Sequence, residues 1–319
     1  MKTHSIGTNI FRGAAKIGRS IPHFRGKYRI LNSLYASLAR NNGGVVNAQL
    51  SKPTPFICEL NLDCAHERLA YCTNGYESDT VLFLLKLWDS YGYFMDIGAN
   101  IGLISVPFTI LAKARTDDHL LPVPLTVCFE PVTSNFASLS RNMESNELNP
   151  YVKLFNAGAG AEDKLVEIQV EGDQLVGAGT GTANILPNGS NYVCERQAIE
   201  VSKIDTLVAM RRIPENCSLI KIDTDGYDFF ALLGAVELLR KSRPIVFGEF
   251  STECMGWHGH SMKQVQKFAS ELDYSLLIRN SNESQWSFRN TDNFEDFVQD
   301  ALLVPTEKLN SCHWCISSE

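Results

Sequence analysis

A glycine-containing turn follows a short apolar segment in the first third of the chain. Residues Tyr93–Ile97 are apolar except for one acid, Asp96, and Gly98 and Gly102 come next, four residues apart. Apolar side chains at helical spacing then follow. This order predicts a strand, a tight turn and a helix start. Glycines let the backbone approach a ligand closely, and the first N–H groups of a helix are free. In open α/β sheets, nucleotide-like cofactors bind at such a turn.

The acid in this turn favours one class of cofactor. A dinucleotide site usually has three glycines and no acid, and the Asp96 carboxylate would repel a pyrophosphate. S-adenosylmethionine (SAM) has no phosphate, and its sulfonium and ammonium would be attracted by an acid. A second apolar segment, Val127–Phe129, ends at Glu130, where a ribose-binding acid is expected one βα unit later. The long spacing from Asp96 is explained by a proline-containing insertion, Arg115–Pro124.

Length and composition limit the class of protein. The chain has 319 residues, of which 44% are hydrophobic, enough for one large domain with extensions. No apolar segment approaches the ~20 residues of a membrane-spanning helix, and the N-terminus lacks the apolar core of a signal peptide. The nine cysteines have no framework spacing, which favours a reducing compartment. We therefore expect a cytoplasmic protein.

Charge is unevenly distributed along the chain. Residues 1–52 contain nine Lys or Arg and no acid, which leaves 20 basic and 36 acidic residues, a net of −16, in the remainder. We expect residues 1–26 to be poorly ordered and Lys27–Arg40 to form an amphipathic helix. The basic arm could contact an anionic membrane surface or an anionic substrate; the alternative is a solvated extension. The acidic body, which lacks an Asn-Pro-Pro-Tyr-like motif, argues against a nucleic-acid partner.

Strands and helices alternate after residue 53. Strands are expected at 56–62, 93–97, 127–129, 151–155, 165–170, 198–201, 218–223, 245–250 and 274–279, with helices at 81–90, 103–113, 133–147, 227–240 and 261–272. Residues 285–289 could pair with the last strand as a hairpin. The polar insert 177–184 is either a flexible lid or a surface loop. The β–α alternation predicts a three-layer α/β/α sandwich with a mainly parallel sheet.

Four short motifs then occur in order: Gly75-Tyr76-Glu77, Asp96–Gly102, Phe129-Glu130-Pro131 and Ile220–Gly226. With these motifs the chain resembles the FkbM family of SAM-dependent methyltransferases over roughly residues 56–279. The resemblance implies a class I methyltransferase (Rossmann-like) fold, a seven-stranded sheet with one antiparallel strand. It also implies O-methylation of a hydroxyl, often on a sugar, polyketide or other secondary metabolite. We expect three parts: a basic N-terminal extension with a short helix (1–52), a SAM-dependent methyltransferase domain (53–290) and a C-terminal tail packed on it (291–319).

The motif match assigns roles to individual residues. Asp96, Gly98 and Gly102 would form the cofactor loop, Glu130 would hold the ribose hydroxyls, and Asp223 would stand beside the methyl group. The expected cofactor-binding residues are Glu77, Asp96, Gly98, Asn100, Gly102, Glu130, Pro131, Ala157 and Asp223. Glu77 could instead stabilise a helix N-terminus. The family commonly has Glu where Asp225 stands, so this chain keeps the charge with a shorter reach.

Methyl transfer from a sulfonium is an in-line displacement that needs an aligned acceptor and a base for its proton. The candidate catalytic residues lie near predicted strand ends: Asp223, Asp225, Glu249, His258 and His260. A pKa near neutrality favours a histidine, although both histidines could simply form hydrogen bonds in a loop.

Acids near these strand ends also raise the question of a metal. Asp223, Asp225, Asp228 and Glu249 offer oxygen ligands that suit Mg²⁺. The favoured alternative is that Asp223 orients substrate, Asp225 caps a turn and Asp228 begins a helix, so we assign no metal ligands.

Cys312-His313-Trp314-Cys315 resembles half of a zinc site, but no second pair has matching spacing, which favours a structural tail.

The sequence therefore predicts a SAM-dependent O-methyltransferase that acts on a hydroxyl of a sugar, glycan or secondary metabolite. Two alternatives remain. One is an NAD-dependent oxidoreductase, against which Asp96 argues. The other is a catalytically inactive SAM-fold interaction module, against which the intact motifs argue. Trp257, Trp286 and Phe288 could line a sugar or apolar acceptor, or could simply pack in the core or on the surface.

Overall fold

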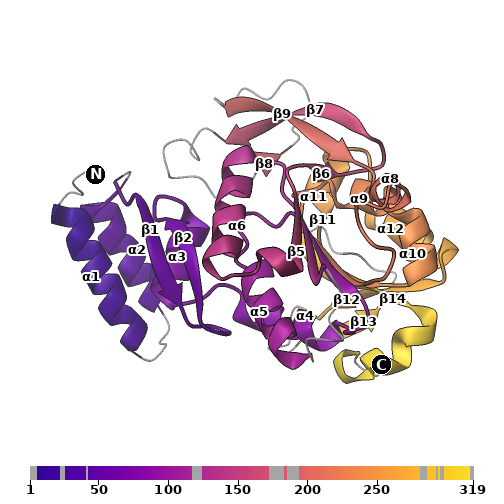
Figure 1. The fold of residues 1–319 in the computed structure, drawn as a ribbon, viewed down its shortest axis with the longest axis horizontal. Coiled ribbons are helices and arrows are strands. Elements are labelled where there is room, and N and C mark those ends of the chain that lie inside the picture. Colours follow the sequence, from indigo (N-terminus) through magenta and orange to yellow (C-terminus); the bar gives the residue numbers. More distant parts are fainter. Residues whose placement is uncertain are drawn as a thin grey trace.

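An eight-stranded sheet runs through the centre of the protein (Figure 1). The computed structural model describes residues 6–21, 26–40, 42–116, 124–171, 183–184, 194–280, 286–291, 294 and 298–316. In spatial order the strands are β13 (Phe288–Asn290), β12 (Tyr274–Arg279), β14 (Val298–Pro305), β11 (Ile245–Ser251), β10 (Cys217–Ile222), β3 (Tyr93–Ile97), β4 (Thr126–Phe129) and β5 (Val152–Phe155). The pairs within β11-β10-β3-β4-β5 are parallel, whereas β14 is antiparallel to β11 and β12, and β13 to β12.

This topology places a crevice at the middle of the sheet. From β3 the chain moves outward through β4 to β5, and it later returns to β10, next to β3, before moving outward to β11. Such a reversal of strand order opens a crevice at the carboxyl ends of the two central strands. The predicted α/β fold is confirmed. The sheet has one strand more than the seven expected, because the predicted hairpin forms and adds β13 to the edge.

Helices cover both faces of the sheet. One face carries α4 (Ser78–Leu87), α5 (Ser105–Arg115) and α6 (Thr133–Ser145); the other carries α8 (Ile204–Ala209), α9 (Asp228–Leu233), α10 (Val236–Ser242) and α12 (Met262–Glu271). Short helices η1 (Asn149–Tyr151), α11 (Thr252–Trp257) and η2 (Thr306–Cys315) complete the order. Side chains alternate between the two faces along each strand: Phe94 packs with α4 and α5, and Met95 packs on the opposite side.

The helix expected at 227–240 is interrupted. It ends as α9 at Leu233 and resumes as α10 at Val236. At the break, a Cβ on Gly234 would lie 2.0 Å from the carbonyl oxygen of Gly160, so the backbone packs directly on a neighbouring segment. The Asp205 carboxylate accepts hydrogen bonds from the first N–H groups of α10, each at 3.0 Å. The close packing at Gly234 ends α9, and the hydrogen bonds from Asp205 stabilise the N-terminus of α10.

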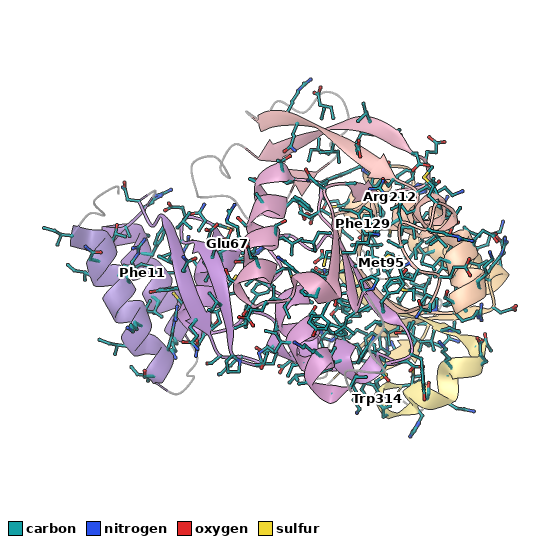
Figure 2. The ribbon with its side chains drawn as sticks, viewed as in Figure 1. Phe11, Glu67, Met95, Phe129, Arg212 and Trp314 are labelled. Atoms are coloured by element: carbon teal, nitrogen blue, oxygen red, sulfur yellow. The ribbon has the colours of Figure 1, made fainter. Side chains whose placement is uncertain are left out.

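Residues 6–73 form a separate lobe, the N-terminal lobe, at one end of the molecule (Figure 1). It contains α1 (Ile6–Ser20), α2 (Lys27–Leu38), the antiparallel hairpin of β1 (Val45–Leu50) and β2 (Phe56–Asn61), and α3 (Ala65–Thr73). The expectation that residues 1–26 are poorly ordered was wrong for α1, because Phe11 is fully buried against Tyr35 with ring centres 5.3 Å apart. Figure 2 shows Phe11 in this lobe, far from Met95 and Phe129 in the sheet.

Both predicted domain boundaries need correction. The boundary at residue 52 falls inside the β1–β2 hairpin. The boundary at residue 290 precedes β14, which pairs with β11 and β12 within the central sheet rather than packing on it as a tail. None of the described helices combines the length and the apolar character needed to cross a membrane.

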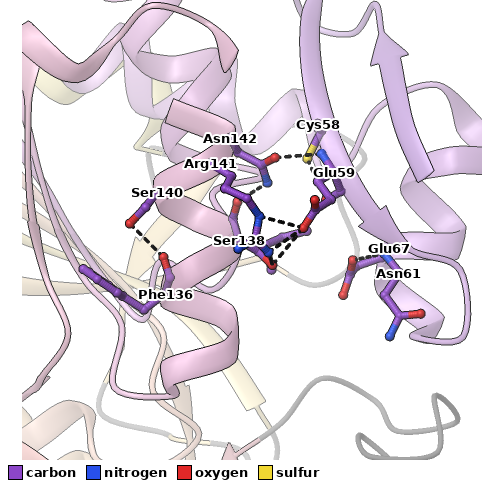
Figure 3. A network of polar contacts seen from close by, with 10 residues as sticks. Cys58, Glu59, Asn61, Glu67, Phe136, Ser138, Ser140, Arg141 and Asn142 are labelled. Carbon is purple, nitrogen blue, oxygen red and sulfur yellow. Dashed lines mark hydrogen bonds and ion pairs between the residues drawn. The ribbon is translucent and has the colours of Figure 1, made fainter. Parts of the chain in front are cut away.

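Polar contacts join the N-terminal lobe to α6 (Figure 3). The Glu59 carboxylate on β2 accepts hydrogen bonds from Arg141 at 2.6 and 3.0 Å. The fully buried Asn142 accepts from the Glu59 N–H at 2.7 Å and donates to the carbonyl oxygen of Ile101 at 2.8 Å. Asn142 therefore connects the lobe with the glycine-containing turn after β3.

A second, smaller sheet lies beside the carboxyl ends of the central strands. It is formed by β6 (Gly158–Ala159), β9 (Cys194–Ser202), β7 (Lys164–Glu171) and β8 (Ala183–Asn184). Most of the insert at 177–184, for which a lid was considered, lies outside the described residues.

Candidate functional site

A cavity of about 460 Å³ opens at the carboxyl ends of β3, β4 and β10. Its position is the crevice that the strand order creates. Nine residues predicted from the sequence line it: Glu77, Asp96, Gly98, Asn100, Glu130, Pro131, Asp223, Asp225 and Glu249. Four do not: Gly102, Ala157, His258 and His260. The fold thus brings the sequence motifs together at this cavity. Most of the four predicted residues that do not line it pack against other parts of the protein.

The turn after β3 depends on its glycines. Gly98, Asn100 and Gly102 have φ values of 82°, 51° and 89°, in the left-handed region that glycine adopts without strain. A Cβ on Gly98 would lie 1.8 Å from the carbonyl oxygen of Asp223, so only glycine lets the ends of β3 and β10 approach this closely. A Cβ on Gly102 would lie 2.8 Å from Leu139. Gly102 therefore lets the start of α5 pack on α6.

Glu130 connects the end of β4 to this turn. Its side chain is 4% exposed, and its two carboxylate oxygens accept hydrogen bonds from the N–H groups of Asn100 at 2.8 Å and Val132 at 2.9 Å. Burial raises the pKa of Glu130 to about 7, although these hydrogen bonds work in the opposite direction. The carboxylate is fixed in position, and its remaining lone pairs can accept hydroxyl groups.

A buried lysine pairs with two of the predicted acids. Lys221 Nζ lies 3.2 Å from Asp96 Oδ1 and 3.2 Å from Asp223 Oδ2, and Asp96 also accepts a hydrogen bond from Ser105. Burial disfavours the charged form of Lys221, but Asp96, Asp223 and Glu77 outweigh it, so its pKa is raised. The sequence motifs did not single out Lys221. Its position two residues before Asp223 was a usable signal, because both side chains then point to the same face of a strand.

An apolar wall forms another part of the cavity lining. It consists of Phe129 at the end of β4, Val132 just before α6, and Ile168, Ile199 and Val201 of the small sheet. Gly158 and Ala159 also line the cavity, whereas Ala157, which we expected there, packs in the core. The N-terminal lobe contributes Cys64, His66 and Glu67 to the lining. Local sequence patterns did not indicate any of these lobe or small-sheet residues, since tertiary packing brings them in.

The turn after β10 is held by Asp228. This fully buried carboxylate accepts hydrogen bonds from the N–H and hydroxyl groups of Thr224, both at 2.9 Å, and from the N–H of Gly226 at 3.0 Å. Burial raises the pKa of Asp228 to about 6. Its oxygens are thus engaged in positioning the turn that carries Asp225. Within the described ranges, no three His, Cys, Asp or Glu side chains are grouped so that they could hold a metal ion.

Glu249 is exposed at the mouth of the cavity, on β11. Its direct neighbour on β14 is Asp300, and Gly248 before it pairs with Ile222, which precedes Asp223. Partial desolvation, together with the charges of Asp223, Asp300 and Glu77, raises the pKa of Glu249 to about 7. A carboxylate with this pKa can accept a proton at neutral pH.

The two candidate histidines lie outside the cavity. His260 packs edge-on against Phe229 and Phe230 with ring centres 4.9 and 4.6 Å apart, and its ring nitrogens have no hydrogen-bond partner among the described residues. His258 packs against Tyr227 and Phe230. Desolvation lowers the pKa of both histidines. In this structure they contact aromatic rings on α9 rather than the ligand space.

A second, larger cleft of about 1170 Å³ adjoins the first. The two share Glu77, Lys221, Asp223 and Glu249. The rest of its lining includes the aromatic residues Phe83, Trp286 and Trp314 and the ion pair between Arg279 and Asp300. Of the other aromatic candidates, Phe288 is fully buried and Trp257 is 40% exposed, but neither lines either space.

The charge of the first cavity fits SAM. Its described lining contains seven acidic side chains, Glu67, Glu77, Asp96, Glu130, Asp223, Asp225 and Glu249, against one lysine, Lys221. The pKa values of Glu67, Glu130 and Glu249 are raised to about 7, so these three are partly ionised near neutral pH. Such a lining attracts a ligand with a sulfonium and an ammonium, and it opposes the pyrophosphate of a nicotinamide cofactor. The apolar wall suits a flat aromatic base, and Glu130 suits a ribose diol. The residues present therefore fit SAM better than they fit NAD.

Comparison with solved structures gives several distant matches. A methyltransferase FkbM from Methylobacillus flagellatus has 14% identity and a TM-score of 0.38, over 93% of this chain and 60% of that one. A precorrin-6y C5,15-methyltransferase from Geobacter metallireducens has 12% identity and a TM-score of 0.36, over 71% and 87% of the two chains. A precorrin 8w decarboxylase from Methanobacterium thermoautotrophicum has 9% identity and a TM-score of 0.37, over 70% and 88%. This chain thus spans 60% of the length of the first of these proteins.

Sequence comparison gives a clearer result. No curated protein matches the chain. The family model described as the methyltransferase FkbM domain matches residues 96–276, which is more than half of the 319 residues and includes the turn after β3, Glu130 and the β10 motif. The chain therefore belongs to the FkbM methyltransferase family.

Proposed function

We propose that this protein is a SAM-dependent O-methyltransferase whose acceptor is a hydroxyl of a sugar, a glycan or a secondary metabolite. The observation that carries the proposal is the strongly acidic cavity at the carboxyl ends of β3, β4 and β10. It excludes phosphate-rich cofactors by charge and favours a sulfonium. Family membership supports the same assignment.

The chain's own residues would hold SAM at three points. Glu130 would accept the two ribose hydroxyls, because its carboxylate is already oriented by Asn100 and Val132. Phe129, Ile199 and the neighbouring apolar side chains would enclose the adenine. Asp96 and Asp223, which are paired with Lys221, would present negative charge toward the ammonium and sulfonium.

The acceptor would enter through the second cleft, since that cleft meets the first at Glu249 and Asp223. When bound, SAM supplies an electrophilic methyl group and a neutral thioether leaving group. Glu249 would take the hydroxyl proton while the acceptor oxygen forms a bond to the methyl carbon and the carbon–sulfur bond breaks. The pKa of about 7 makes Glu249 a suitable base near neutrality.

Calorimetric titration tests the cofactor assignment. SAM should bind the wild-type protein and NAD should not. Glu130→Gln keeps the size of the side chain but removes its charge, so it should weaken SAM binding by roughly 1–3 kcal/mol. Glu162→Gln, an exposed carboxylate away from the cavity, is the matched control and should leave the affinity unchanged.

Turnover tests the reaction itself. The wild-type protein should release S-adenosylhomocysteine when supplied with SAM and a polyhydroxylated acceptor, and the methyl group should appear on an acceptor oxygen in the product. SAM binding without methyl transfer to any hydroxylated acceptor would favour an inactive interaction module. Binding of NAD in place of SAM would reject the proposal.

A further inference from the structure

Four isoleucines form an exposed row on the N-terminal lobe. On α1 the side chains of Ile6, Ile10 and Ile17 are 81%, 53% and 66% exposed, and Ile21, directly after the helix, is 47% exposed. Spacings of four, seven and four residues place them on the same side of a helix. The opposite side of α1 buries Phe11 and Ala15. The row, which we call the isoleucine face, is therefore an apolar surface that the described part of the chain leaves exposed, on a helix whose other side is already packed.

The surroundings of the isoleucine face are basic. Lys16 on α1 and Arg29 on α2 are exposed, and Lys27 Nζ donates to the carbonyl oxygen of Ile21 at 2.7 Å. No acidic residue precedes Glu59 in the chain. Two further cations are used internally: Arg12 and Arg19 donate to backbone carbonyls of the lobe. The lobe that carries the apolar row thus also presents exposed positive charge at Lys16 and Arg29, with no acid nearby in the sequence to neutralise it.

We propose that the isoleucine face docks peripherally on a membrane surface rich in anionic lipids. An amphipathic helix with apolar side chains on one face and Lys or Arg beside them binds such a surface by inserting the apolar groups and attracting the headgroups. The face fits a second copy of the chain less well, because two basic surfaces would then meet without a counter-charge. The inference does not depend on the proposed methyl transfer.

The charge of the whole molecule orients this contact. Residues 53–319 carry a net charge of −16, so an anionic membrane repels the body of the protein. In Figure 1, α1 lies at one end of the longest axis, and the central sheet lies away from it. Only the N-terminal lobe would therefore touch the membrane.

Co-sedimentation of the full chain with vesicles tests the proposal. The protein should bind phosphatidylcholine vesicles that contain phosphatidylserine much more tightly than vesicles of phosphatidylcholine alone, and added salt should weaken binding. Ile10→Ala/Ile17→Ala should reduce the partition coefficient by about tenfold or more, since it removes apolar groups that would be buried in the bilayer. Lys16→Ala should reduce it about fivefold. Alanine preserves the helix because it has the highest helix propensity.

A matched double variant provides the control. Leu165→Ala/Met210→Ala removes apolar side chains that are 75% and 65% exposed on the body of the protein, and it should bind vesicles like the wild type. Equal binding to both kinds of vesicle, or an equal loss in the control, would overturn the proposal. So would a dimer, detected by light scattering, that Ile10→Ala/Ile17→Ala disrupts while vesicle binding is unchanged. Thermal unfolding of each variant verifies that the lobe remains folded.

Discussion

Partial desolvation, together with the charges of three other acids that face it, raises the pKa of Glu249. Asp300 is its direct partner on β14, Asp223 follows the neighbouring strand, and Glu77 approaches from the start of α4. Lys221 lowers the pKa of Glu249, but this cation is already paired with Asp96 and Asp223. A carboxylate in such surroundings holds its proton up to a higher pH than a free glutamate does.

This arrangement predicts the pH dependence of methyl transfer. If Glu249 is the base, kcat/KM should rise with pH and level off above about 7, since only the ionised form accepts a proton. Glu249→Gln should lower the rate by roughly 10²- to 10⁴-fold while SAM binding persists. Measurement of initial rates across the pH range checks both outcomes.

Asp300→Asn is the informative companion variant. It removes one of the charges that raise the pKa of Glu249 and frees Arg279 from its ion pair. Both effects favour the ionised form, so the midpoint of the rate profile should move to lower pH. An unchanged midpoint would mean that another group controls the profile.

At Gly98 the neighbouring backbone leaves no room for a side chain. Gly98→Ala would place a methyl group 1.8 Å from the carbonyl oxygen of Asp223 at a φ of 82°. We expect a loss of roughly 1–3 kcal/mol of stability from backbone strain alone, and weaker SAM binding because the turn must move. Gly256→Ala is the control, since nothing lies within 4 Å of its Cβ position. Urea denaturation of both variants measures the difference; equal stabilities would contradict the close approach.

At the scale of elements, β3 and β10 are held together by charge as well as by backbone pairing. Asp96 and Lys221 are register partners, and their side chains are 0% and 6% exposed. Neither charged group is exposed to enough water to remain ionised there without the other. The pair therefore makes each strand depend on the other at the point where the cavity begins.

Removing only one member of this pair should be costly. Lys221→Met leaves the Asp96 carboxylate buried beside Ser105 without a cation, and we expect a loss of roughly 3–5 kcal/mol in the free energy of unfolding. Adding Asp96→Asn should recover much of the loss, because the uncompensated charge is gone. Urea denaturation of the two variants measures this recovery. A double variant as unstable as Lys221→Met alone would show that packing, and not charge, holds the strands.

The elements that were predicted correctly have strong local patterns. β3, β4, β10 and β11 are short apolar segments with acids at or near their ends, so both their type and their place at the cavity followed from the sequence. β14 was missed because its sheet position between β11 and β12 depends on long-range pairing. α1 was missed because its three glycines disfavour a helix, whereas packing against α2 stabilises it. Ile168, Ile199 and Glu67 were likewise not predicted to line the cavity, because tertiary packing and not a local pattern brings them there.

At the scale of the whole molecule, folding buries several acids together with their protons. Burial raises the pKa of Glu67 and Glu130 to about 7 and that of Asp228 to about 6. The ordinary values are 4.5 for the two glutamates and 3.8 for the aspartate. Two of these residues line the cavity and the third holds the turn beside it. The fold thus concentrates at the cavity acids whose ionisation is unfavourable.

This burial fixes the direction in which pH changes stability without ligand. Between the unfolded and folded pKa values the folded state binds more protons, so stability falls as pH rises from about 4 to about 7, and the cost is complete above about 7. His258 and His260, whose pKa values are lowered, act in the opposite direction, but both are partly exposed. We therefore expect the protein to unfold at a lower temperature at about pH 8 than at about pH 5.5.

Glu67→Gln provides the internal test of this explanation. Glutamine can still accept the hydrogen bond that Glu67 receives from the Asn61 N–H, but it carries no charge at any pH. The variant should therefore be more stable than the wild type at about pH 8, by on the order of 1–3 kcal/mol, and nearly equal to it below about pH 5. Thermal unfolding at both pH values measures this. A stabilisation that is the same at both would place its origin in packing, whereas one confined to high pH would locate the cost in the buried charge.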